Sequence, residues 1–131
     1  RLVSLQLSAI YFWGAVDKTR MAFLGGDRVE QPLMYLYFGS DHPGQWFHLA
    51  AIAFAWSTIL LEYALTVGLW IPRVRLPLMA LGLSFHAGLY YFLPVTVFSI
   101  SSMAAYIAYF HPAQVHRVID RMLGTMTPRE E

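Results

Sequence analysis

The chain has 131 residues, of which 57% are hydrophobic, 16% aromatic and only 13% charged. An ordinary soluble domain has about 25% charged residues, so a soluble domain of this length could not hide so much apolar surface. Nine basic and eight acidic side chains leave a net charge of +1, which gives no indication of nucleic-acid binding. These residues include no cysteine, which excludes disulfides, thiolate metal sites and thiol nucleophiles among them. The composition therefore indicates a membrane protein whose main partner is the lipid bilayer.

Long runs without charge divide the chain into predicted helices. Residues 76–116 contain no Asp, Glu, Lys or Arg over 41 positions, and residues 42–61 contain none over 20. A membrane-crossing helix needs about 20 mostly apolar residues, so the longer run is enough for two crossings. Breaks are expected at Gly25–Gly26, Pro72 and Pro94, because glycine and proline interrupt helices. We therefore expect an all-α integral membrane bundle without a sheet, with about four transmembrane helices, at about 2–24, 46–70, 76–92 and 95–110.

The segments between and after these helices are also interpretable. Residues 25–45 are the one polar stretch inside the chain and are expected to form a loop with an aromatic middle at the headgroup level. Pro72 should end the second helix, with Arg73 and Arg75 in a short basic turn. Residues 1–112 would form the transmembrane domain, and 113–131 an amphipathic tail on its cytoplasmic side. The helical spacing in this tail predicts either an interfacial helix on the membrane or a short cytosolic helix packed on protein.

Basic residues near the helix ends predict the orientation. With four crossings, one side carries six of them and the other carries three: Arg1, Arg73, Arg75, Arg117, Arg121 and Arg129 against Lys18, Arg20 and Arg28. The side with six should be cytoplasmic, and we expect a multi-pass protein located in the bacterial inner membrane. Because the first residue is Arg rather than Met, we expect the chain to be a piece of a longer protein.

Three ionisable side chains lie within the apolar runs, where charge is costly and marks a candidate functional site. At about 1.5 Å per residue, Glu62 and His86 lie roughly 12 and 15 Å from the same end of two neighbouring antiparallel helices. They are expected to meet, either as a structural clamp or as a proton relay. Lys18, the only lysine, is either an anchor that extends to the headgroups or a base whose charged form is disfavoured by apolar surroundings. The histidines share no ligand spacing, so no metal site is predicted.

Several motifs together resemble a known membrane family. The segment from Tyr11 to Lys18, with Gly26 after a hydrophobic Phe23-Leu24, resembles the signature of the horizontally transferred transmembrane (HTTM) domain family. That family is related to the membrane part of vitamin K-dependent gamma-carboxylase. Leu60-Leu61-Glu62 and Ser84-Phe85-His86 resemble its next landmarks, in the same order and at similar spacing. The resemblance covers about residues 6–110 and corresponds to the C-terminal half of the domain.

The resemblance implies an all-helical membrane protein whose missing partner is the N-terminal part of the same domain. In the animal carboxylase the motif lysine deprotonates vitamin K hydroquinone, so that role would fall on Lys18, supported by Glu62 and His86. Vitamin K hydroquinone or another quinone would then be the cofactor. The chain departs from the family pattern at Thr19, where Leu is usual, and at Phe23, where Trp is usual. The alternative is a non-catalytic membrane subunit or scaffold, similar to the small DoxX-like four-helix proteins, in which the polar groups only lock helices together.

Overall fold

The computed structural model describes residues 2–39, 43–93, 95–110 and 120, and the described part contains helices but no strand. The expectation of an all-α fold is therefore confirmed. The elements in chain order are α1 (Leu2–Lys18), α2 (Met21–Leu24), α3 (Asp27–Leu33), the π-helical turn η1 (Met34–Phe38), α4 (Gln45–Gly68), α5 (Pro72–Phe92), α6 (Thr96–Ala105) and the 3-10 turn η2 (Tyr106–Tyr109).

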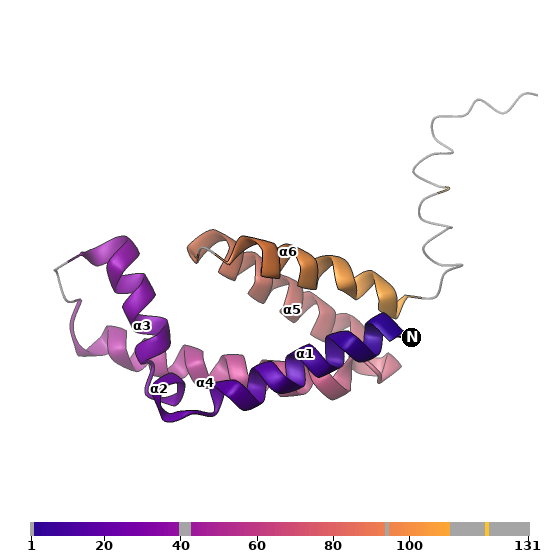
Figure 1. The fold of residues 1–131 in the computed structure, drawn as a ribbon, viewed down its shortest axis with the longest axis horizontal. Coiled ribbons are helices and arrows are strands. Elements are labelled where there is room, and N and C mark those ends of the chain that lie inside the picture. The colour runs from indigo at the N-terminus through magenta and orange to yellow at the C-terminus, as the bar shows by residue number, and fades with distance from the viewer. Residues whose placement is uncertain (1, 40–42, 94, 111–119, 121–131) are drawn as a thin grey trace, which may run out of the picture.

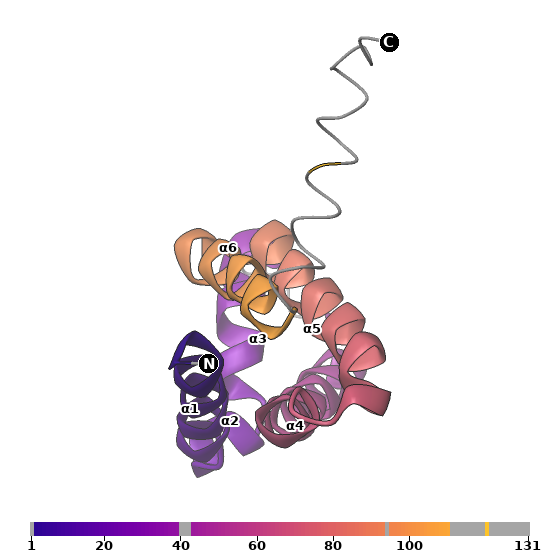
Figure 2. The ribbon, with the colours of Figure 1, turned by 90° about the vertical axis from the view of Figure 1, so that its right-hand side faces the viewer.

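The four longer helices run roughly along the length of the molecule (Figure 1), and α3 stands across one end of them. Helix α1 packs along α4, α4 contacts α5, and α5 packs against α6. The end of α6 and the turn η2 return to α1, so the four helices surround a common interior when viewed end-on (Figure 2). This arrangement places side chains from α1, α4, α5 and α6 in one core.

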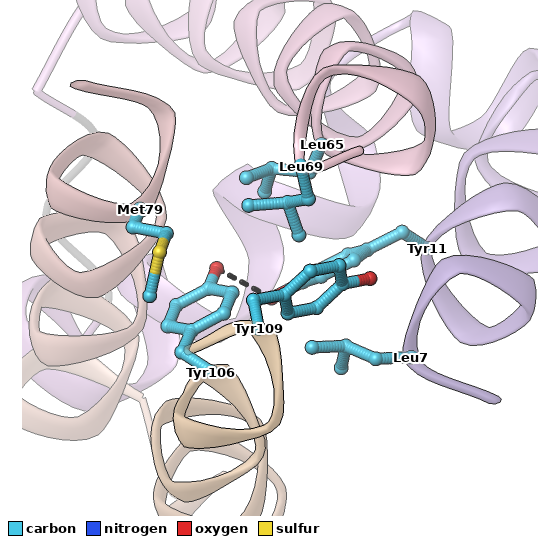
Figure 3. Close-up of a cluster of buried hydrophobic side chains, with 7 residues drawn as sticks. All are labelled: Leu7, Tyr11, Leu65, Leu69, Met79, Tyr106 and Tyr109. Carbon is cyan, nitrogen blue, oxygen red and sulfur yellow. Dashed lines mark hydrogen bonds between the residues drawn. The ribbon is translucent and has the colours of Figure 1, made fainter. Parts of the chain in front are cut away.

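The core has two parts. The larger cluster consists of seven buried side chains from α1, α4, α5 and η2, shown in Figure 3: Leu7, Tyr11, Leu65, Leu69, Met79, Tyr106 and Tyr109. The smaller cluster joins α3 to the first half of α4 through Val29, Ala51 and Ala55. Three of the seven residues in the larger cluster are tyrosines, so this core brings hydroxyl groups into an otherwise apolar interior.

Most predicted helix boundaries agree with the structure, and three differ. The break at Pro94 is confirmed, since α5 ends at Phe92 and α6 begins at Thr96. The expected loop at 25–45 contains helix α3 and the turn η1. Gly26 has φ of 84° and lets the chain turn into α3, whose first turn carries Asp27 and Glu30 near the positive end of the helix dipole. The predicted first helix is also interrupted, between Lys18 and Met21.

Pro72 has a different role from the one predicted. It opens α5 instead of ending the previous helix, because the first residues of a helix need no backbone N–H and proline fits there. Arg73 and Arg75 therefore lie in a helical first turn. Arg75 donates from Nε to the Leu69 carbonyl oxygen and from a terminal nitrogen to the Tyr109 carbonyl oxygen, both at 2.9 Å. One guanidinium thus caps the ends of α4 and η2.

Among the described residues, α4 is the one helix of 18 or more residues that is apolar enough to cross a membrane. The helical stretch Thr96–Tyr109 is apolar but shorter. The tail predicted at 113–131 lies outside the described residues except for Asp120, which is exposed.

Candidate functional site

One face of α1 carries the polar groups of the candidate site. Ser4, Ser8, Tyr11, Ala15 and Lys18 recur every three or four residues and therefore share a side of the helix. The first four are buried, and the Lys18 side chain is 27% exposed. Because this face packs against α4, it supplies hydrogen-bonding groups along the length of the interior.

The deepest ionised group is paired with the only lysine. Lys18 Nζ donates to both carboxylate oxygens of Glu62, at 2.8 and 3.0 Å, and the Glu62 side chain is 5% exposed. Gly14 borders this pair, and a Cβ there would be in ordinary van der Waals contact, at 3.5 Å, with each carboxylate oxygen and with Nζ. The Phe23 ring, 5.8 Å from Nζ, covers another side of the ammonium. The pair has no net charge and is largely shielded from the surroundings.

A second set of polar groups is centred on Tyr11. Its hydroxyl oxygen lies 2.9 Å from His86 Nε2 and 2.6 Å from the Tyr106 hydroxyl, a bond drawn in Figure 3. His86 is 1% exposed, and its ring makes edge contacts with Phe85 and Phe98. One tyrosine of α1 therefore links α5 with the end of α6.

The hydrogen-bond directions in this chain can be assigned from its connectivity. If Tyr106 donates to Tyr11 and Tyr11 donates to His86 Nε2, every hydroxyl hydrogen has an acceptor. The ring proton of His86 then sits on Nδ1, which is buried and has no partner among the described residues, as is also true of the Ser99 hydroxyl. A buried donor without an acceptor costs about 1–3 kcal/mol. A ligand oxygen that accepted a hydrogen bond from His86 Nδ1 would remove this cost, so its binding here would be favoured.

A third network closes the end of the bundle near the N-terminus of α1. Tyr109 donates to the Ser4 carbonyl oxygen at 2.8 Å and lies 3.0 Å from the Ser8 hydroxyl, which therefore donates to it. Trp70 Nε1 in turn donates to the Ser8 hydroxyl at 2.7 Å. Neither Tyr109 nor Trp70 was predicted as a site residue, because an aromatic side chain in an apolar sequence gives no sign of its hydrogen bonds.

The predicted site residues do face the interior, but the structure gives them other partners than expected. Glu62 bonds to Lys18 and His86 bonds to Tyr11, and no hydrogen bond joins Glu62 to His86 in the described part of the chain. Depth along the helices was the basis of the expectation, and depth does not tell which neighbour a side chain faces. The seven-residue spacing of Tyr11 and Lys18, two helical turns, was the signal that could have identified both partners.

An apolar cavity of about 420 Å³ lies between α3, α4 and α5. Its walls include Val29, Phe47, Phe54 and Phe85, and the rings of Phe54 and Phe85 stack at 6.2 Å. Phe85 also makes an edge contact with the His86 ring, although His86 itself does not line the cavity. Lys18 is not among the residues that line it.

No family model, curated protein or solved structure matches the chain. The geometry of the site provides a lysine–glutamate pair, a tyrosine–histidine chain and, at Phe85, an apolar cavity.

Proposed function

We propose that the chain is part of a multi-pass membrane protein of the HTTM domain family, in which Lys18 and Glu62 together accept a proton from a quinol. The observation that carries the proposal is the Lys18–Glu62 contact. The sole lysine of the family-like motif meets the carboxylate of the second motif inside the bundle. Ionisable groups in such surroundings are rare and mark sites of proton or substrate handling.

The outer surface of the helices supports a membrane location. Large apolar side chains are exposed on α1, α4, α5 and α6, among them Trp13, Leu60, Leu81 and Val97. Soluble proteins rarely expose contiguous apolar surface of this kind. Helix α4, with 24 residues, is about 36 Å long at 1.5 Å per residue, which is enough to cross a hydrocarbon core of about 30 Å.

The proton transfer follows from the pairing of Lys18 with Glu62. A shielded pair can exist as ammonium and carboxylate or, after an internal proton shift, as amine and carboxylic acid, and neither form has a net charge. The amine nitrogen of Lys18 has a lone pair that accepts the proton of a quinol hydroxyl group. The products are an ammonium ion and a quinol oxyanion, which attract each other, while Glu62 keeps the other proton.

The remaining groups suggest how an apolar quinol would be held. The cavity beside Phe85 offers apolar walls for a ring or an isoprenoid tail. His86 Nδ1 would donate to a quinol oxygen, which satisfies a buried donor. Tyr11 fixes the opposite nitrogen of the same ring, so its role is to orient His86 rather than to touch the substrate.

The test uses the full-length protein in lipid nanodiscs with vitamin K hydroquinone and oxygen, and follows loss of the hydroquinone by absorbance. Lys18→Arg keeps a cation beside Glu62, but a guanidinium does not give up its proton. We expect Lys18→Arg to lower the rate by about 100-fold or more, the usual contribution of a general base. Arg20→Lys changes an exposed residue paired with Asp17 and should leave the rate unchanged. A wild-type protein that does not consume the hydroquinone, or an active Lys18→Arg, would contradict the proposal.

The second candidate is a non-catalytic membrane scaffold. It is favoured by the network of Ser4, Ser8, Trp70 and Tyr109, which joins helices at the far end of the bundle without any polar group left for a substrate. A scaffold predicts that substitutions at Lys18 change stability while no quinol is consumed by the wild-type protein. The nanodisc experiment therefore distinguishes the two candidates.

A further inference from the structure

A second group of ionisable side chains lies where α3 meets the beginning of α4. Gly26 brings the two helices together: a Cβ at this position would be 2.9 Å from the Ile52 backbone nitrogen and 3.2 Å from the Ala51 carbonyl carbon. Its φ of 84° is also one that residues with side chains rarely adopt. The first turn of α3 is therefore held close to α4, one turn from His48.

Asp27, Glu30 and His48 converge at this contact. Asp27 and Glu30 are three residues apart and so lie on the same side of α3. His48 Nδ1 lies 2.6 Å from a carboxylate oxygen of Glu30, and one ligand-type atom from each of the three residues lies within 4.8 Å of the others. The Glu30 side chain is 12% exposed, so part of this cluster is shielded from water.

The donor set matches a particular class of ion. Two carboxylate oxygens and one imidazole nitrogen suit zinc and similar divalent transition metals, whereas magnesium and calcium prefer oxygen ligands alone. A tetrahedral ion with ligands at about 2.1 Å holds them roughly 3.4 Å apart. Asp27 is exposed and can rotate to close the remaining separation. Three protein ligands leave a fourth position for water or for a ligand oxygen.

The neighbours of the cluster would strengthen the binding. Val29 directly precedes Glu30 in sequence, Phe47 directly precedes His48, and both line the apolar cavity between α3, α4 and α5. An apolar wall lowers the local dielectric constant and so increases the attraction between a cation and its carboxylates.

We propose that Asp27, Glu30 and His48 bind a divalent transition-metal ion of the zinc class, with one coordination position open. The basis is the convergence of these three side chains across the α3–α4 contact that Gly26 sets. The sequence analysis predicted no metal site because it searched for regular spacing among histidines. This site takes one ligand from α4 and two acidic ligands from a helix that the sequence analysis did not predict.

The experiment is a titration of zinc chloride into the metal-stripped full-length protein, purified without a histidine tag and held in nanodiscs, followed by calorimetry. We expect saturable binding of one equivalent. Asp27→Asn, Glu30→Gln and His48→Gln should each weaken it by at least about 10-fold, since even residues that only support metal ligands contribute that much. Asp17→Asn removes an exposed carboxylate that pairs with Arg20 outside the cluster and should bind like the wild type.

A second measurement separates loss of the site from loss of the fold. Melting temperatures of the metal-free variants should stay near that of the wild type for Asp27→Asn, because its side chain is exposed, and zinc should raise the wild-type value. Absence of a saturable equivalent, or unchanged binding by Asp27→Asn and His48→Gln, would overturn the proposal. Equal binding of magnesium or calcium would overturn the assigned class of ion.

Discussion

The two members of the Lys18–Glu62 pair differ in burial, so removing one should cost more stability than removing the other. Glu62 is almost fully buried, whereas Lys18 retains some exposure and a flexible stem that can carry its ammonium outward. Lys18→Met strands a buried carboxylate and should lower the free energy of unfolding by about 3 kcal/mol. Glu62→Gln should cost about 1 kcal/mol, because the amide still accepts a hydrogen bond. Unfolding in bicelles measures both values.

The exposed pair of Asp17 and Arg20 is the matched control for this comparison. Its members lie three residues apart at the end of α1 and are well exposed, so breaking it with Arg20→Met should change the free energy of unfolding by less than about 1 kcal/mol. If Lys18→Met and Glu62→Gln lowered the free energy of unfolding equally, or if Glu62→Gln lowered it more, the burial of Glu62 would not determine how much stability the pair contributes.

Tyr11 makes a separate prediction. Tyr11→Phe removes one hydroxyl that serves both His86 and Tyr106 and leaves both of those buried groups without it. We expect a loss of about 1–3 kcal/mol in the free energy of unfolding, the usual cost of unsatisfied buried polar groups. Tyr91→Phe is the control, because Tyr91 is 80% exposed and should change stability by less than about 0.5 kcal/mol. If Tyr11→Phe and Tyr91→Phe changed the free energy of unfolding equally, the hydrogen bonds of Tyr11 would not stabilise the fold.

Single residues also show what the sequence could reveal about the site. An ionisable side chain in an apolar run stands out without any structure, which is why Lys18, Glu62 and His86 were predicted as site residues. The partner of each side chain depends on the rotation of its helix and on which helix packs beside it. Tyr11 in particular is an ordinary aromatic residue in the sequence, and only the fold, which brings His86 of α5 and Tyr106 of η2 within hydrogen-bonding distance, gives its hydroxyl a role.

Helix contacts depend on small residues at specific positions. Gly82 of α5 faces Tyr106: a Cβ there would overlap the hydroxyl oxygen of Tyr106 and lie 3.3 Å from a methyl carbon of Leu65. Gly82→Ala should therefore push α5 away from η2, disturb the Tyr11–Tyr106 bond, and cost about 1–3 kcal/mol in the free energy of unfolding.

Gly88 of the same helix provides the comparison. A Cβ at Gly88 would have no atom within 4 Å, so Gly88→Ala should be neutral or raise the stability by up to about 1 kcal/mol through helix propensity. Thermal unfolding of the two variants measures the difference. A Gly82→Ala protein as stable as Gly88→Ala would mean that α5 and η2 are not packed as described.

Helix ends were predictable where glycine or proline interrupts an apolar run, as at Pro94. Helix α3 was missed for a physical reason: its seven residues include three charged ones, so they show no apolar period of their own. The turn of the chain at Gly26 and the contact with α4 stabilise it instead. Pro72 was placed at the wrong end of a helix because proline is compatible with a first turn as well as with a break.

At the scale of the whole molecule, the distribution of polar and apolar side chains between the interior and the outward face of the bundle bears on whether it lies in a membrane. Buried tyrosines, serines, a histidine and two glutamates share the interior with leucines and alanines, while many large apolar side chains are exposed on the outside. Composition predicts a membrane protein, because an excess of apolar residues has to face either a core or lipid, and among the described residues one helix, α4, is long and apolar enough to cross a membrane. Composition does not give the number of membrane crossings, because that number depends on helix length: α1 has 17 residues and the stretch Thr96–Tyr109 is shorter still.

Substituted-cysteine labelling of the full-length protein tests most directly whether α4 crosses the membrane, the crossing on which the proposed bundle depends. These 131 residues contain no cysteine, and any cysteine elsewhere in the full-length protein is replaced by serine, so that a thiol introduced here reports its own position. The three variants are Tyr35→Cys in η1, Leu60→Cys within α4 and Arg73→Cys at the start of α5, all labelled with a membrane-impermeant maleimide. We predict that Tyr35→Cys reacts only in intact spheroplasts, Arg73→Cys only in inside-out vesicles, and Leu60→Cys only after detergent is added. Reaction of Tyr35→Cys and Arg73→Cys from the same side, or of Leu60→Cys without detergent, would contradict a bundle that crosses the membrane.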